Sequence, residues 1–270
     1  MNKKHLKLAA LVLALAMIVG LGLFANALVG NPVSRALATR AAKKRMAEQY
    51  PSYTLERVTY SFKDGNYHAF FTDPHQMDGD FSMAFTGVGK LLWDSYEDRV
   101  LSGENTRSRL SMEYRAMVDA VLEAPQAGLP LDFGFGDLEC WSREALDNED
   151  APHYALITEE LEVNGTYDVR ALGARAGHLV YYLQEESPSV ERLAHWLLEI
   201  RRMMDKSGVP FVDIDLTLRY LHDENGSRPE SDLYVLHFPY ADIYEEGLLE
   251  RVKQANADAI AYYEELDKTK

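Results

Sequence analysis

One long apolar stretch near the amino end constrains this chain more than any other feature. Three lysines within the first seven residues precede eighteen uncharged and mostly aliphatic residues, Leu8 to Ala25, and the apolar character continues to Val29. A bilayer core of about 30 Å is crossed by roughly 20 helical residues. The sequence therefore predicts that residues 8–29 form a membrane segment, which decides the compartment of everything that follows.

The same pattern has a second interpretation, a cleaved secretion signal. Ala25-Asn26-Ala27 matches an A-x-A cleavage site. Signal peptides have apolar regions of about 7–15 residues, and the longer run here favours an uncleaved anchor. Five basic residues between 35 and 45 nearly balance the lysines on the other side. Because a long following domain translocates largely regardless of its charge, we expect a single-pass cell-membrane protein with its carboxyl-terminal domains outside the cytoplasm.

Charge is divided unevenly along the chain. Residues 35–125 contain 12 basic and 13 acidic residues, whereas residues 126–270 contain 13 basic and 30 acidic residues, a net charge of −17. Nucleic-acid phosphates and anionic lipids both repel a surface of this sign. The distal half is therefore expected to bind no nucleic acid, and its charge favours a basic protein or peptide as a partner.

Recognisable signatures of catalysis or cofactor binding are absent from the sequence. It contains no H-E-x-x-H, G-x-S-x-G, G-x-G-x-x-G or P-loop pattern. Its only cysteine, Cys140, excludes an intramolecular disulfide and a thiolate metal cluster, and is expected to be a buried, inert thiol. No cofactor is predicted.

Residues 31–124 are predicted to form a membrane-proximal α+β domain. An Ala-, Lys- and Arg-rich run to Gln49 has strong helix propensity, with Ser34 as its cap. Antiparallel strands are then predicted over 53–62, 67–72, 81–85 and 88–93. Asp64-Gly65 favours a hairpin turn between the first two. A helix follows from Arg107, where apolar side chains recur at helical spacing.

Residues 125–270 are predicted to form a second, acidic α+β domain after a linker rich in proline and glycine. Strands are expected over 131–141, 178–184, 211–221 and 233–238, and a last helix over 248–266. Another helix begins at Ser187-Pro188 and ends at Gly208. The fold class is therefore α+β, with an amino-terminal transmembrane helix or signal over 1–30 followed by two small antiparallel-sheet α+β domains.

Part of the membrane-proximal domain resembles a known module. A helix leads into Tyr50-Pro51-Ser52-Tyr53, and Val58 and Tyr60 precede the Asp64-Gly65 turn and Tyr67. This arrangement, over 41–71, resembles the PepSY-like module of extracytoplasmic bacterial proteins.

A second resemblance extends over both halves of the chain. It rests on the stretches Gly30-Asn31-Pro32-Val33-Ser34, Trp93-Asp94-Ser95-Tyr96-Glu97-Asp98-Arg99-Val100, Tyr167-Asp168-Val169-Arg170, Ala176-Gly177-His178 and Asp242-Ile243-Tyr244-Glu245-Glu246-Gly247-Leu248. Together they resemble the YfjL-like family of membrane-anchored bacterial proteins. The resemblance implies an amino-terminal anchor with two small α+β domains outside the cytoplasm. It brings no catalytic or ligand-binding residues to this chain.

Two groups of carboxylates are the candidates for chemistry. Asp213 and Asp215 lie on one face of a predicted strand, about 7 Å apart, a spacing compatible with an acid/base pair or with metal binding. A solvated strand face is the interpretation we prefer, because a catalytic pair needs convergent partners in a cleft. Asp73, Asp78 and Asp80, near His75, could supply oxygen ligands to calcium, but the loop lacks the closing glutamate of an EF-hand.

His178 and His237 fall in predicted strands, where we interpret them as hydrogen-bonded structural residues. The sequence thus favours a non-enzymatic, membrane-anchored extracytoplasmic module that binds or regulates a partner. The alternative is an extracytoplasmic hydrolase that uses Asp213 and Asp215, and a third possibility is cleaved secretion. The ligand, any reaction, the oligomeric state and the relative motion of the domains are not encoded in any motif.

Overall fold

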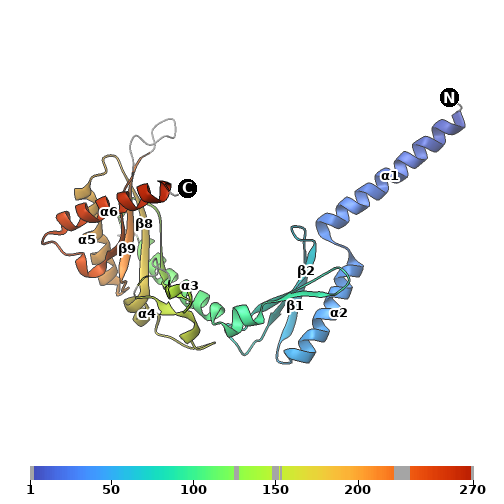
Figure 1. Cartoon of the computed structure of the whole chain (residues 1–270), viewed down its shortest axis with the longest axis horizontal. Coiled ribbons are helices and arrows are strands. Elements are labelled where there is room, and N and C mark those ends of the chain that lie inside the picture. The colour runs from blue at the N-terminus through green and yellow to red at the C-terminus, as the bar shows by residue number, and fades with distance from the viewer. Residues whose placement is uncertain (1–2, 125–127, 148–151, 153, 222–231, 269–270) are drawn as a thin grey trace. The chain divides into compact units, whose positions relative to one another are not determined.

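The chain forms two compact units in the computed structural model, Met1–Thr106 and Arg107–Lys270 (Figure 1). The structure describes residues 3–124, 128–147, 152, 154–221 and 232–268. Helices and mostly antiparallel strands make up both units, which confirms a mixed α+β fold. Each unit is described by itself below.

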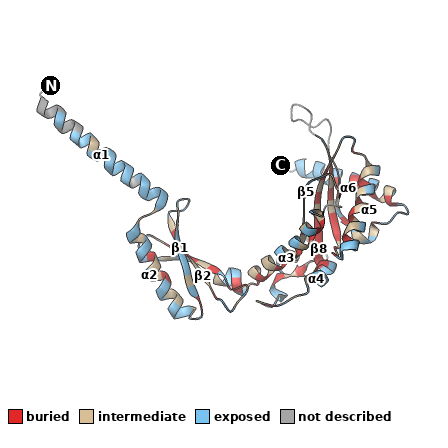
Figure 2. Ribbon diagram, turned by 180° about the vertical axis from the view of Figure 1, so that it is seen from behind, coloured by how far each residue is buried: buried red, intermediate tan, exposed pale blue. Residues whose placement is uncertain are grey.

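The first unit begins with α1 (Lys3–Val29), a helix of 27 residues. It is long and apolar enough to cross a membrane, and its large apolar side chains are exposed over the part described, for example at Leu21 and Phe24 (Figure 2). The predicted membrane segment over residues 8–29 therefore lies within one helix.

A short break separates α1 from α2 (Pro32–Gln49). Gly30 adopts a left-handed φ of 70°, a conformation that glycine reaches without steric strain. The side chain of Asn31 accepts a hydrogen bond from the Ser34 amide at 2.8 Å, so the helix cap is Asn31 rather than the predicted Ser34. Pro32 takes the first helical position, where its missing N–H costs no hydrogen bond.

Four antiparallel strands form the first sheet, in the order β1 (Thr54–Ser61), β2 (Asn66–Thr72), β3 (Phe81–Phe85) and β4 (Leu91–Asp94). Aromatic side chains on alternate positions of β2 and β3 point into the core, and Phe71 and Phe81 stack with ring centroids 4.9 Å apart. The small side chains of Ala38 and Ala42 are fully buried, which lets α2 approach the sheet closely. The four predicted strands are confirmed.

The second unit contains a four-stranded sheet in the order β10-β9-β8-β5. Its elements are α3 (Glu104–Leu122), β5 (Leu131–Leu138), α4 (Val169–Ala176), β8 (Gly177–Glu185), α5 (Val190–Ser207), β9 (Asp213–Tyr220), β10 (Leu233–Pro239) and α6 (Leu248–Lys268). The second unit also contains the helical turns Ala145–Asp147, Thr158–Glu160 and Tyr240–Asp242 and the bridge of β6 (Cys140–Trp141) with β7 (Leu156–Ile157), whereas the helical turn Glu97–Leu101 belongs to the first unit.

One strand pair of this sheet is parallel. β8 pairs in parallel with β9 and antiparallel with β5, while β9 and β10 form an antiparallel pair. The crossover from β8 to β9 is α5, which lies beside α6 next to the strands (Figure 1). The helix begins two residues later than predicted, with Ser189 as its cap, and Gly208 ends it as expected with a φ of 64°. The sheet is therefore mixed.

Helix α3 packs with the second unit, whereas the sequence predicts it in the membrane-proximal domain. Leu110, Tyr114 and Val118 are fully buried in the core of that unit. Gly136 leaves the space they need, since a Cβ there would lie 2.4 Å from the Val118 side chain. The boundary between the units thus lies before α3, and residues 125–127 of the predicted linker lie outside the described residues.

We predict that Leu110→Ala destabilises the second unit by about 2–5 kcal/mol, because it leaves a cavity in a close-packed core. Hydrogen exchange of the whole chain would then show lost amide protection in β8 and β9. Met112→Ala on the same helix is the control, since Met112 is 64% exposed. Equal loss of protection in β2 and β3 would contradict the placement of α3.

Candidate functional site

Four ionisable side chains meet in the second unit, His178, Asp213, Asp215 and His237, and we call them the His–Asp cluster. His178 is the second residue of β8 and lies opposite Asp213, the first residue of β9. Paired residues of neighbouring strands point to the same face of a sheet. The alternation predicted for β9 is confirmed, since Ile214, Leu216 and Leu218 are fully buried on the other face.

A β-bulge in β10 brings in the fourth side chain. The register shifts between Val235 and Phe238, so His237 lies in an irregular stretch of the strand. Its φ of 46° is left-handed, which is uncommon for a residue other than glycine. The bulge turns its N–H toward Asp215, and this N–H donates to the Oδ1 atom at 2.7 Å. The Asp215 side chain thus accepts a hydrogen bond that a backbone carbonyl of the neighbouring strand accepts in a regular strand pair.

Asp213 orients both imidazole rings. Its side chain is 3% exposed, its Oδ1 atom lies 2.6 Å from Nδ1 of His178, and its Oδ2 atom lies 3.0 Å from Nδ1 of His237. An ionised carboxylate only accepts hydrogen bonds, so both Nδ1 atoms donate to it. The Tyr154 hydroxyl is also near Asp213 and favours its ionised form, although its geometry falls short of a hydrogen bond.

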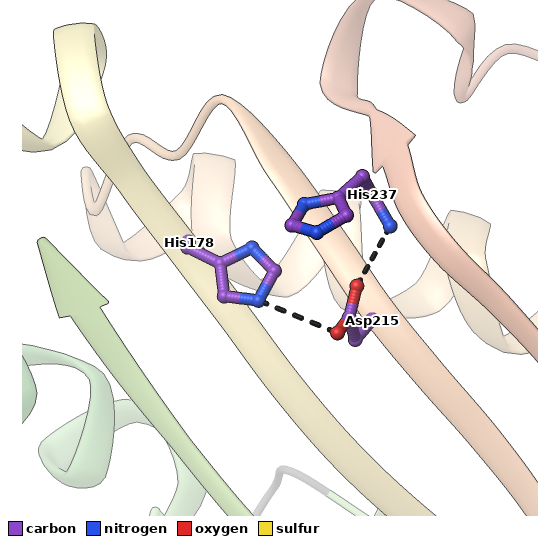
Figure 3. A group of neighbouring side chains, drawn as sticks. All are labelled: His178, Asp215 and His237. Carbon is purple, nitrogen blue, oxygen red and sulfur yellow. Dashed lines mark hydrogen bonds and ion pairs between the residues drawn. The ribbon is translucent and has the colours of Figure 1, made fainter. Parts of the chain in front are cut away.

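The second nitrogen of the His178 ring faces Asp215. Nε2 of His178 lies 3.6 Å from Oδ2 of Asp215, and the two imidazole rings are 5.1 Å apart between centroids. Figure 3 shows the three side chains converging from β8, β9 and β10. One ligand-type atom from each of them lies within 4.8 Å of the other two. Such a set of two histidines and one carboxylate is a donor set for a transition metal.

The four charges balance one another. Burial works to lower the pKa of His178, but the hydrogen bond to Asp213 and the ion pair with Asp215 outweigh it and raise that pKa to about 10. Burial works to raise the pKa of Asp213, but hydrogen bonds from the two histidines outweigh it and lower that pKa to about 2. The hydrogen bond to Asp213 also raises the pKa of His237. The cluster therefore favours two negative carboxylates with an equal positive charge between them.

A groove of about 550 Å³ adjoins the cluster. Its lining comes from β9, β10 and α6 and consists of Asp215, Leu236, His237, Ala255, Asp258, Ala259, Tyr262 and Tyr263. The His237 side chain is 57% exposed and that of Asp215 is 25% exposed, whereas His178 is 7% exposed. Solvent and ligands therefore reach the cluster through Asp215 and His237. A larger hollow of about 820 Å³, between α1 and α2, contains no carboxylate or histidine.

Hydrogen bonds within the first unit engage two of the other predicted carboxylates, Asp73 and Asp78. Asp73 accepts from the His75 amide at 2.9 Å, which lowers its pKa, and Asp78 accepts from the Thr106 hydroxyl at 2.7 Å. Asn105 donates to the backbone carbonyls of Asp78 and Asp80. Among the described residues, only the set of His178, Asp215 and His237 gathers three such side chains closely enough to hold a metal.

The sequence identified the two carboxylates of the cluster and missed its two histidines as functional candidates. His178 meets Asp213 only because β8 and β9 pair in parallel across α5. His237 reaches Asp215 only because of the bulge in β10. A single sequence predicts neither the parallel pairing of β8 with β9 nor the bulge in β10. Its only hint is that each of these strands has polar residues on one face.

We predict that Asp213→Asn lowers the free energy of unfolding by about 3–5 kcal/mol at pH 7, since it removes the counter-charge of buried His178. A carboxyl group with a depressed pKa stabilises the fold fully above its unfolded pKa, and this contribution disappears as the pH falls through the folded pKa. Urea unfolding followed by tryptophan fluorescence measures the change. Asp258→Asn, at an exposed position, should change stability by less than about 0.5 kcal/mol. Equal effects of the two substitutions would contradict the role of Asp213.

Comparison with known families agrees with the two-part architecture. Residues 4–94 match the family model described as "YfjL-like, N-terminal domain", and residues 113–253 match the "YfjL-like C-terminal domain". The second match includes the whole His–Asp cluster. Comparisons with curated proteins and with solved structures found no match, and the PepSY-like resemblance of residues 41–71 stays a prediction. On these two matches, the chain belongs to the YfjL-like family.

Proposed function

We propose that this protein is a membrane-anchored extracytoplasmic binding module whose second unit holds a basic peptide segment of a partner protein. Residues 8–29 would anchor it, and the groove beside the His–Asp cluster would receive the segment. The observation that carries the proposal is the lining of this groove, where Asp215 and Asp258 lie near two tyrosines, in a half of the chain with a net charge of −17.

The chemistry of the groove suits lysine and arginine side chains. Tyr262 and Tyr263 are 47% and 43% exposed, and tyrosine is enriched at protein interfaces. Aromatic rings attract cations over their faces, and they also pack against the aliphatic part of a lysine or arginine. The carboxylates supply the opposite charge, which speeds the encounter with a basic partner.

A carboxylate-dependent hydrolase is the second candidate, and the position of Asp215 favours it. Asp215 lies between two histidines and lines the groove. Because Asp213 is buried and engaged by both rings, Asp215 would act as the general base and Asp213 would position the histidines. Turnover of a chromogenic ester, phosphate or glycoside by the purified chain, slowed about 10²–10⁴-fold by Asp215→Asn, would favour this candidate over the binding module.

We predict that a carboxyl-terminal alkaline phosphatase fusion is active in a bacterial host and that a fusion reporter active only in the cytoplasm is not. The reason is that the distal domain translocates if the amino end stays inside. The mass of the purified protein then separates an anchor from a signal cleaved near Ala27. Activity of the cytoplasmic reporter alone would contradict the extracytoplasmic location.

We also predict that a lysine- and arginine-rich peptide of about ten residues binds the purified chain, and that Asp258→Asn weakens it about threefold to fivefold, as expected for one partly exposed charge. Fluorescence anisotropy at two salt concentrations measures the affinity, which salt should lower. Glu186→Gln removes an equal charge at an exposed position outside the groove and is the control. Equal weakening by both substitutions would indicate nonspecific attraction and refute groove binding.

A further inference from the structure

We propose that His178, His237 and Asp215 form a binding site for one divalent transition-metal ion, such as Zn²⁺, and that Asp213 positions the two histidines. This inference goes beyond the proposed function, because it requires no partner protein. It rests on the arrangement of the described side chains.

The first argument is the direction of the ring nitrogens. Metal-binding histidines commonly donate their second ring N–H to a carboxylate, which fixes the ring and its tautomer. Here one buried carboxylate, Asp213, receives Nδ1 of both histidines. Nε2 of each ring is thereby left as the ligand atom. Sharing of one orienting carboxylate by two histidines explains why Asp213 is buried although it is charged.

The second argument is distance. Zinc bonds of about 2.0–2.1 Å place tetrahedral ligand atoms about 3.4 Å from one another. Nε2 of His178 is 3.6 Å from Oδ2 of Asp215, close to that value. One ligand-type atom from each of the three side chains lies within 4.8 Å of the other two, so a bound metal requires only a small shift of His237, whose side chain is the most exposed of the three.

The third argument is charge. The two carboxylates carry two negative charges, and a divalent ion that displaces one proton from each imidazole would balance them in place of those protons. This balance makes a cation, rather than an anion, the ligand class that the cluster selects. Two nitrogen donors favour a transition metal over Ca²⁺ or Mg²⁺, which take oxygen ligands.

The fourth argument is the backbone at His237. Its left-handed φ of 46° costs of order 1–3 kcal/mol for a residue other than glycine. An ordinary antiparallel pairing of β9 with β10 would avoid this cost, but it would also remove the His237 ring from Asp213 and the His237 N–H from Asp215. Backbone strain of this kind is concentrated at functional sites.

The site would be open rather than closed. Three protein ligands leave a fourth tetrahedral position, and the groove that Asp215 and His237 line would supply it. An open position is typical of a metal that exchanges a water molecule or binds a further ligand, whereas structural zinc sites use four protein ligands. The metal would thus be accessible to ligands in the groove.

Zinc titration of the whole chain tests the site. The chain is purified in detergent without a polyhistidine tag, stripped with a chelator and titrated with Zn²⁺ alone by isothermal calorimetry. We expect one ion per chain. His237→Ala should weaken binding at least 100-fold, and Asp213→Asn about 10–100-fold, as for other orienting partners of metal ligands. Co²⁺ should give a visible absorption band in the parent chain that His237→Ala abolishes.

Control variants distinguish Zn²⁺ binding at the cluster from nonspecific Zn²⁺ binding elsewhere on the surface. His195→Ala also removes one histidine, but His195 lies on α5 against Trp196, outside the cluster, so Zn²⁺ affinity should be unchanged. Hydrogen exchange verifies the fold of each variant, and Asp215→Asn replaces any variant that fails to fold. No saturable binding by the parent chain, or the same affinity in His237→Ala and His195→Ala, would overturn the proposal. Because no peptide is present, this outcome is independent of peptide binding.

Discussion

Burial of one charged group, the Asp213 carboxylate, organises the second unit around it. An ionised carboxylate taken out of water is strongly destabilising unless hydrogen bonds and opposite charge surround it. His178 and His237 provide both, and they come from the strands on either side of β9. The position of Asp213 therefore depends on the parallel pairing of β8 with β9 and on the bulge in β10 at the same time.

Several features of the fold serve this arrangement. The crossover helix α5 allows β8 and β9 to run parallel, which places His178 beside Asp213. Small residues at Gly136, Gly173 and Gly177 let Tyr114 of α3 pack against β5, α4 and the start of β8. The Tyr114 hydroxyl then donates to the Pro210 carbonyl at 2.8 Å, a few residues before Asp213. Packing on the apolar face thus supports the chain that leads into the cluster.

The cluster and the acidic charge lead to compatible proposals. Asp215 belongs both to the metal donor set and to the lining of the groove, so a bound metal and a bound peptide would be neighbours. The metal would reduce the negative charge of Asp215. Asp258, in the same groove, would then be the carboxylate that attracts a basic segment. The apolar helix α1 is long enough to hold such a module at a membrane.

The sequence by itself determined the apolar helix, the α+β class, the strands of the first sheet and the shared face of Asp213 and Asp215. These features depend on local composition and on periods of 2.0 or 3.6 residues, which a single sequence displays. Only the tertiary structure decided that α3 belongs to the second unit, that β8 and β9 are parallel and that two histidines meet Asp213. Those features arise from pairing between segments far apart in the chain, and local patterns do not specify which strands become neighbours or where a bulge shifts their register.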